Sequence, residues 1–305
     1  MSAPVATATR GAIAFTRGRS GALLALLVLS VIAVAAFLAP LIAPQDPFDL
    51  ASFDILDAEL PPAWQEGGEA RFPLGTDAQG RDLLSAILYG ARISLLIGIL
   101  AVLIQAAIGV SLGLLAGYFG GRTDSIVTRL ADIQLALSTL MMAIVAMALV
   151  RAGLGGQALS LFAVPLLVIV IGLAEWPIFA RTARAAVLVE VTKDYVRAAR
   201  AIGDSDWTIL RRHILPNSLS PLIIVATTQV AGAIMAEAAL SFLGLGMPVT
   251  KPSLGTLIRS GYDLMFAGSW WVTVLPGLVL IAVLISINVL GDGLRDWLDP
   301  RRGAR

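Results

Sequence analysis

Long uncharged apolar runs dominate the chain and alternate with short polar connections. Six runs are long enough to cross a membrane, because a spanning helix needs about 20 apolar residues to cover roughly 30 Å of hydrocarbon. They cover residues 21–43, 93–121, 133–150, 152–174, 214–236 and 264–291. A further run, 238–250, is short and contains two glycines and a proline, which favours a re-entrant or surface loop. The pattern predicts an all-α fold with six membrane-spanning helices.

The first apolar run follows Arg10, Arg17 and Arg19, an arrangement that secretory signal peptides also show. A signal peptide has an apolar region of about 7–15 residues, and this run is longer. We therefore expect an uncleaved first span. The chain then divides into a tail, first span and external segment over residues 1–90, a five-span permease core over 91–292, and a tail over 293–305.

Basic residues distribute unevenly between the connections. If the N-terminus lies in the cytoplasm, 16 of the 22 lysines and arginines fall on the cytoplasmic side. The positive-inside rule therefore favours two cytoplasmic termini. The external segment 44–90 then holds nine acidic residues and two arginines, and we expect it to end in a short amphipathic helix at residues 82–89. It is either a docking surface for an external protein or a solvated linker.

Composition excludes several kinds of chemistry. The chain is 57% hydrophobic and 14% charged, whereas about a quarter of the residues in a soluble domain are charged. It has no cysteine and one histidine, His213, so it cannot form a disulfide, a thiolate nucleophile or a multi-histidine metal site. No glycine precedes a lysine, so a phosphate-binding P-loop is absent from the sequence. Any ATP hydrolysis must occur on another chain, and a net charge of +1 gives no indication of nucleic-acid binding.

The polar connection 190–216 predicts two short helices joined at a glycine. We expect Thr192 to cap the first helix and Gly203 to end it in the left-handed conformation. The second helix is predicted to start at the acidic cluster 204–206 and to end at Pro216.

The first of these helices carries an apolar stripe of small side chains. Residues at helical spacing form it: Tyr195, Ala198, Ala199 and Ile202. A surface helix with such a stripe, held between two spans, is suited to insertion into a partner protein.

The sequence of this connection, RAARAIGDSDWTILRRHILP, resembles the cytoplasmic signature of permeases of ATP-binding cassette importers. That signature is Glu-Ala-Ala, three residues, Gly, nine residues, Ile, one residue, Leu-Pro. The residues that match it in register are Ala198, Ala199, Gly203, Leu215 and Pro216. Arg197 replaces the glutamate and His213 the isoleucine, so roles that depend on those two side chains do not carry over.

Four other segments narrow the resemblance to the dipeptide/oligopeptide/nickel permease subfamily. They are PLGTDAQGRDLLSAILYGARISLLIG (73–98), GLLAGYFGGRTDSIVTRLADI (113–133), EAALSFLGLG (237–246) and NVLGDGLRDWLDPRR (288–302). The chain is similar to the subfamily member with an extra N-terminal span and external segment. Where the family often has a proline near the middle of the third span, this chain has Ser138, so we expect a weaker bend there.

The resemblance implies the type I ABC importer permease fold, with six transmembrane helices and a cytoplasmic coupling-helix loop. It implies a bacterial inner membrane, a second homologous permease subunit, two cytoplasmic ATPases and an external solute-binding protein. ATP and Mg²⁺ would bind to the ATPases, and this chain would bind no cofactor or metal and catalyse no reaction. Di- or oligopeptides are the implied cargo, with nickel, glutathione or another small solute as the alternative. No substrate-contacting residue is assigned.

Candidate functional residues follow from the loop and from charges near span ends. The expected ATPase-coupling residues are Tyr195, Ala198, Ala199, Arg200, Gly203 and Asp206. Glu237, at the outer end of the fifth span, is a gate residue or a structural partner of the loop after it. Arg129 and Asp132 are expected to pair one helical turn apart, with a coupling role as the alternative. Glu175 is expected at the cytoplasmic exit of the fourth span, as an interfacial boundary.

Two other classes of membrane protein compete with an ABC permease. An ion-driven secondary transporter would carry ionisable residues or broken helices at the midplane, but the predicted spans are nearly free of charge through their centres. A membrane enzyme would need a catalytic constellation, which one histidine and no cysteine do not provide.

Overall fold

The computed structural model describes residues 5–49, 54–153 and 156–298, and their regular elements are helices. Four helices are long and apolar enough to cross a membrane: α1 (Val5–Phe37), α3 (Leu83–Phe119), α11 (Leu219–Phe242) and α13 (Trp271–Leu298). The other elements are α2 (Ala39–Ile42), a 3₁₀ turn (Ile55–Asp57), α4 (Gly121–Ala136), α5 (Thr139–Gly153), α6 (Gly156–Ala174), α7 (Trp176–Glu190), α8 (Asp194–Ile202), α9 (Asp206–Thr208), a π-helical turn (Ile209–Ile214), α10 (Leu215–Asn217) and α12 (Leu254–Met265). The pairs α4–α5 and α6–α7 are bent, and they raise the number of spans to six if each pair counts as one.

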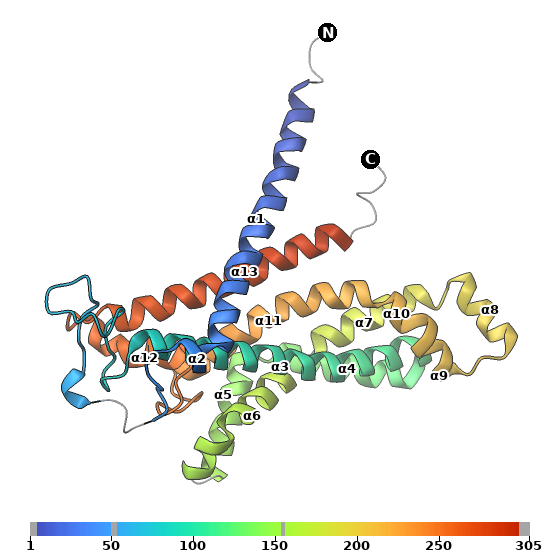
Figure 1. The fold of residues 1–305 in the computed structure, drawn as a ribbon. Coiled ribbons are helices and arrows are strands. Elements are labelled where there is room, and N and C mark those ends of the chain that lie inside the picture. Colours follow the sequence, from blue (N-terminus) through green and yellow to red (C-terminus); the bar gives the residue numbers. More distant parts are fainter. Residues whose placement is uncertain (1–4, 50–53, 154–155, 299–305) are drawn as a thin grey trace.

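Helix α3 forms the centre of the bundle, with α7, α6, α11 and α1 packed against it (Figure 1). Glycines permit the closest approaches. A Cβ at Gly113 would lie 2.4 Å from the carbonyl oxygen of Ala180 on α7, and one at Gly98 would lie 2.5 Å from the side chain of Ile234 on α11. Packing between membrane helices relies on such small residues, because lipid is as apolar as the side chains themselves.

The third predicted span, 133–150, is not a single helix. Helices α4 and α5 meet at an angle of 87°, so the prediction of a weaker bend at Ser138 was wrong. Leu137 takes an extended conformation and ends α4, while the carbonyl of Ser138 accepts the first hydrogen bond of α5 from Met142 at 2.9 Å. An extended residue followed by a new helix start breaks the helix without a proline.

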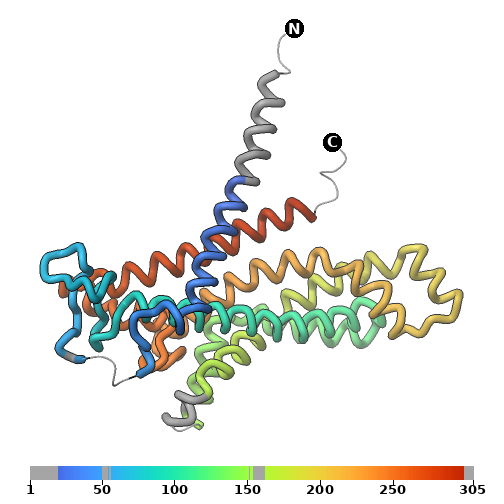
Figure 2. The backbone as a smooth tube through the Cα atoms, viewed as in Figure 1, coloured from blue at the N-terminus to red at the C-terminus, as the bar shows by residue number. Residues whose placement is uncertain are grey.

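The fourth predicted span also contains a bend, of 44° between α6 and α7. Pro177 lies in the first turn of α7 and has no N–H for the carbonyl of Leu173, four residues earlier. Glu175 lies at this bend, and the chain continues as a helix to Glu190. The helix thus continues past Glu175, and the position of Glu175 at the cytoplasmic exit of the span stays a prediction. As the backbone trace shows, α5 and α6 project to one side of the bundle (Figure 2).

The segment 44–90 is tied to the end of the bundle opposite α8 and α9 (Figure 1). A buried ion pair joins Arg81 to Asp77 at 2.6 Å, and Arg81 also donates a hydrogen bond of 2.9 Å to the carbonyl of Val249. The indole N–H of Trp271 donates to the carbonyl of Thr76 at 3.2 Å. These contacts contradict a loosely solvated linker for this part of the segment.

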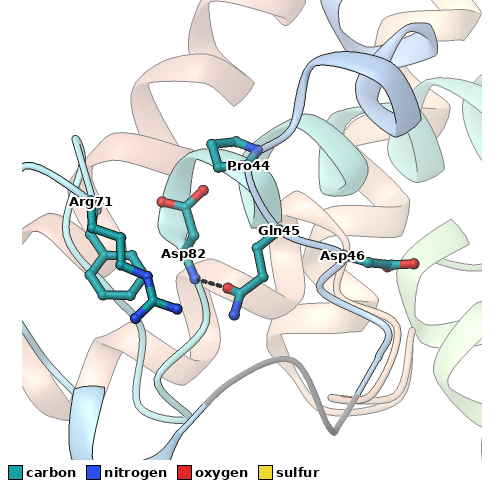
Figure 3. A pocket seen from close by; sticks show the side chains of 6 residues that line it. Pro44, Gln45, Asp46, Arg71 and Asp82 are labelled. Atoms are coloured by element: carbon teal, nitrogen blue, oxygen red, sulfur yellow. Dashed lines mark hydrogen bonds between the residues drawn. The ribbon is translucent and has the colours of Figure 1, made fainter.

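Helix α3 starts earlier than predicted, so the expected short helix at 82–89 is its first two turns. Asp82 caps α3 by accepting a hydrogen bond from the backbone N–H of Ser85 at 2.8 Å. The side chain of Gln45 accepts another from the N–H of Asp82 (Figure 3). A pocket of about 300 Å³ lies here, lined by Pro44, Gln45, Asp46, Arg71, Phe72 and Asp82. The last two predicted spans, 214–236 and 264–291, correspond to α11 and α13, which start and end five to seven residues later in the chain.

Candidate functional site: the polar loop and the bends that it meets

The loop after α7 folds into two short helical segments. Gly203 ends α8 with a φ of 95°, the left-handed conformation that the sequence predicts, and its N–H bonds back to α8. Thr192 is not the cap: Lys193 takes that position without a side-chain hydrogen bond, and the Thr192 hydroxyl donates to the carbonyl of Val189. Pro216 does not end the second segment, because the chain stays helical through Asn217, and only a single turn residue, Ser218, separates it from α11.

The predicted apolar stripe of α8 is divided between two faces: Tyr195 and Ala199 pack inward, whereas Ala198 and Ile202 do not. Val196 and Ala199 are buried, in a cluster with Val187, Ile209, Leu210 and Ile214. Ala198 is exposed, and Ile202 is 84% exposed. The helix therefore rests on Val196 and Ala199 and presents its other side outward. Arg197, Arg200 and Trp207 are exposed there as well, so this surface carries apolar and cationic side chains together.

Glu190, the last residue of α7, holds the loop to the span. Its carboxylate accepts a hydrogen bond from the Tyr195 hydroxyl and pairs with the Lys193 ammonium at 2.6 Å. Burial raises the pKa of Tyr195 to about 12, and the hydrogen bond and charge of Glu190 add to the effect. Tyr195 thus faces the interior of this chain, whereas the sequence predicted it on the apolar stripe that inserts into a partner protein.

Tyr118, near the end of α3, was missed by the sequence analysis. Its hydroxyl donates a hydrogen bond of 2.6 Å to Asp206, and the Arg200 guanidinium lies 5.3 Å from the centre of its ring. Tyr118 therefore brings two of the predicted loop residues together from either side of Gly203. A Tyr-Phe pair directly before two glycines at a span end was the available signal.

Helices α4 and α7 are joined by ion pairs near the same end of the bundle. Arg184 donates to Asp124 at 2.6 Å, and Arg181 pairs with Asp132. The predicted pair between Arg129 and Asp132 was wrong. The carboxylate of Asp132 reaches across to the neighbouring helix, and Arg129 is exposed.

Glu237 is fully buried near the C-terminal end of α11. It accepts hydrogen bonds of 2.7 Å from Ser94 on α3 and from Ser241, one turn later on α11. These contacts place it among structural partners and away from any surface.

A second polar group lies where the bends occur. Gln134, near the end of α4, donates to the carbonyls of Leu173 and Ala174 and accepts from the indole of Trp176. Gln229 on α11 donates to Gln105 on α3 at 3.2 Å and to Glu175 at 2.7 Å. These three glutamines lie inside predicted apolar runs, and their position there was the available sequence signal.

Residues 109–303 match the family described as binding-protein-dependent transport system inner membrane component. The di/tripeptide transport system permease protein DppC of Pseudomonas aeruginosa is 43% identical over 92% of this chain and 88% of its own length. The dipeptide transport system permease protein DppC of Escherichia coli K12 is 42% identical, over 94% and 91%. The glutathione transport system permease protein GsiD of Pectobacterium atrosepticum is 37% identical, over 90% and 85%.

The fold also matches a solved structure. A chain of the methionine ABC transporter MetNI in an inward-facing conformation superposes with a TM-score of 0.55 and 18% identity, over 70% of this chain and 96% of that chain. At this level of identity the match concerns the fold alone, which is that of a type I ABC importer permease.

Proposed function

Because this chain belongs to the family of binding-protein-dependent transport system inner membrane components, we propose that it is the permease subunit of an importer for dipeptides or other short peptides. The peptide cargo is inferred from sequence identity to two permeases: 43% to one named for di/tripeptides and 42% to one named for dipeptides, each over more than nine-tenths of this chain. The relative named for glutathione supports the same class, because glutathione is itself a small peptide. Nickel or another small solute is the alternative cargo.

The complete importer contains a second permease, two cytoplasmic ATPases and an external solute-binding protein. The exposed side of α8 and α9 docks on an ATPase. Ile202 and Trp207, 84% and 59% exposed, provide apolar contacts there, and Arg200 provides a charge. Exposed apolar side chains rimmed by polar ones mark a protein interaction site, and aromatic and arginine side chains dominate the energy of such interfaces.

Movement of the ATPases reaches the spans through α7. The contacts of Glu190 with Lys193 and Tyr195 tie α8 to the end of α7, and the ion pairs of Arg181 and Arg184 tie α7 to α4. Closure of the ATPase dimer around ATP moves the loops of the two permeases together. Helices α7 and α4 then tilt as a unit about the bends, which opens the path outward, and hydrolysis reverses the change. ATP drives the cycle because it stabilises one of the two conformations.

The loop therefore lies in the cytoplasm together with both termini, and α12 and the segment 44–90 face outward. The distribution of basic residues supports this orientation. The solute-binding protein docks at that outer end.

Peptide uptake by cells that depend on this chain tests the proposal. Labelled dipeptide should enter when ATP is supplied and the ion gradients are collapsed, and unlabelled dipeptides, but not nickel, should compete. Arg200→Glu should reduce co-purification of the ATPases and uptake together, whereas the charge reversal Glu66→Arg in the external segment should leave co-purification unchanged. Uptake that requires an ion gradient would contradict an ABC mechanism, and competition by nickel alone would contradict the peptide cargo.

A further inference from the structure

Glu175 lies at the bend between α6 and α7, where the chain leaves several backbone carbonyls without helical partners. Side-chain amides supply those partners. Gln105 donates to the carbonyl of Ile171 at 3.3 Å, and Gln134 donates to the carbonyls of Leu173 and Ala174 at 2.5 and 2.7 Å. Unsatisfied backbone groups are costly in a membrane, so these two glutamines account for the stability of the bend.

The carboxylate of Glu175 takes no part in that arrangement. Its side chain does not cap α7, and its hydrogen bond comes from the neutral amide of Gln229. Across residues 5–49, 54–153 and 156–298, none of the ion pairs includes Glu175. The nearest arginine along α7, Arg181, is paired with Asp132. The bend would form equally well with a glutamine at position 175.

An acidic side chain within a span is costly, and such residues face the interior of a bundle or a water-filled cavity. Glu175 is only half-buried by its own chain. Its uncovered side therefore needs polar surroundings, which a solute path between this chain and a second permease would supply.

We propose that Glu175 and Gln229 form a binding site for the ammonium group of a peptide as it crosses the membrane. Both hydrogen bonds of Gln229 within the described residues are donated by its Nε2, so its Oε1 is a second acceptor beside the carboxylate. The α-amino group of a peptide has a pKa of about 8 and carries a proton at neutral pH. The proposal rests on the proposed peptide cargo.

An ammonium group fits this site better than a metal ion does. The described part of the chain has no group of three or more His, Cys, Asp or Glu side chains that would hold a metal. One carboxylate and one amide oxygen match the hydrogen-bond donors of an ammonium group. They also bind it weakly enough for release, which conduction through a membrane path requires.

The test compares uptake of labelled dialanine in cells that carry the wild-type chain or Glu175→Gln, at about pH 6.5 and about pH 9. Glutamine keeps the shape and the bond to Gln229 but removes the charge. The external binding protein is the same in both strains, so its own pH dependence cancels in the ratio of the two rates. Glu175→Asp, which keeps the charge, and Asp292→Asn, an exposed carboxylate at the far end of α13, are the controls.

At pH 6.5 we expect the wild-type rate to exceed that of Glu175→Gln by about tenfold, the size of one charge-assisted hydrogen bond. The ratio should approach one at pH 9, where most of the peptide amine has lost its proton. Glu175→Asp should exceed Glu175→Gln at pH 6.5 and not at pH 9, and Asp292→Asn should stay within about threefold of wild type at both pH values. Equal rates at both pH values, or the same loss at both, would overturn the ammonium site and leave the peptide cargo intact. Absence of dialanine uptake by the wild type would overturn the cargo and this site together.

Discussion

Ser94 on α3 donates a hydrogen bond of 2.7 Å to Glu237 on α11, across 143 positions of sequence. The same carboxylate accepts from Ser241, whose hydroxyl also accepts from the backbone N–H of Met247 at 3.1 Å. The Ser94 hydroxyl in turn accepts from the N–H of Leu254, the first residue of α12. One buried carboxylate thereby holds α3, α11 and the start of α12 together at the end of the bundle opposite α8.

Removal of that carboxylate should destabilise the protein. Glu237→Ala leaves the hydroxyls of Ser94 and Ser241 without their acceptor and opens a cavity, for an expected loss of about 2–4 kcal/mol. Thermal unfolding in detergent, followed by size-exclusion chromatography, measures the effect. Glu66→Ala, at an exposed position, is the matched control. Equal melting temperatures for the two variants would show that the buried network contributes nothing.

A methyl group at Gly113 should disrupt the contact between α3 and α7. Its Cβ would lie 2.4 Å from the carbonyl oxygen of Ala180 and 2.7 Å from the Cβ of Ala183, and such overpacking costs about 1–3 kcal/mol. Gly277→Ala makes the same substitution in a helix where no atom lies within 4 Å of the new Cβ. We expect a lower melting temperature for Gly113→Ala only. A drop of the same size in both variants would indicate a general effect of replacing helix glycines.

Substitution of Gly203 should affect coupling more than stability. Nothing lies within 4 Å of a Cβ there, so the cost arises from the φ of 95°, about 1–2 kcal/mol for a residue with a Cβ. Valine resists this conformation most and asparagine tolerates it. Gly203→Val should lower the amount of peptide transported per ATP hydrolysed, with Gly203→Asn close to wild type. Identical ratios in both variants would remove this turn from the coupling route.

The contact between Tyr195 and Glu190 should be insensitive to pH in the physiological range. The pKa of Tyr195 rises from 10.0 to about 12, so the folded state favours the protonated phenol. Its contribution is complete below pH 10 and disappears as pH rises through 12. Tyr195→Phe should therefore cost a constant amount, about 1 kcal/mol, between about pH 6 and pH 9.

Ultraviolet titration of phenolate absorbance in the wild type and in Tyr195→Phe measures this shift directly. The difference between the two curves isolates Tyr195 from the other three tyrosines of the chain. A midpoint near 10 in that difference would show that neither burial nor Glu190 acts on this hydroxyl.

The sequence by itself determined the membrane class, the family and the loop. Apolar runs of sufficient length, and the spacing from Ala198 to Pro216, are local properties that a linear pattern records. Gly203 was predictable for the same reason, because a left-handed residue at a helix end is a local requirement that glycine meets.

The tertiary structure alone decided the partners of the charged side chains and the places where spans bend. Asp132 reaches Arg181 instead of Arg129 because a neighbouring helix lies within reach, and no helical spacing reveals that neighbour. Gln134 stabilises the bend at Glu175 from another helix. Hydropathy therefore ended the fourth span at residue 174, before α7, whereas contacts between distant residues hold Glu175 at a bend from which the helix continues to Glu190.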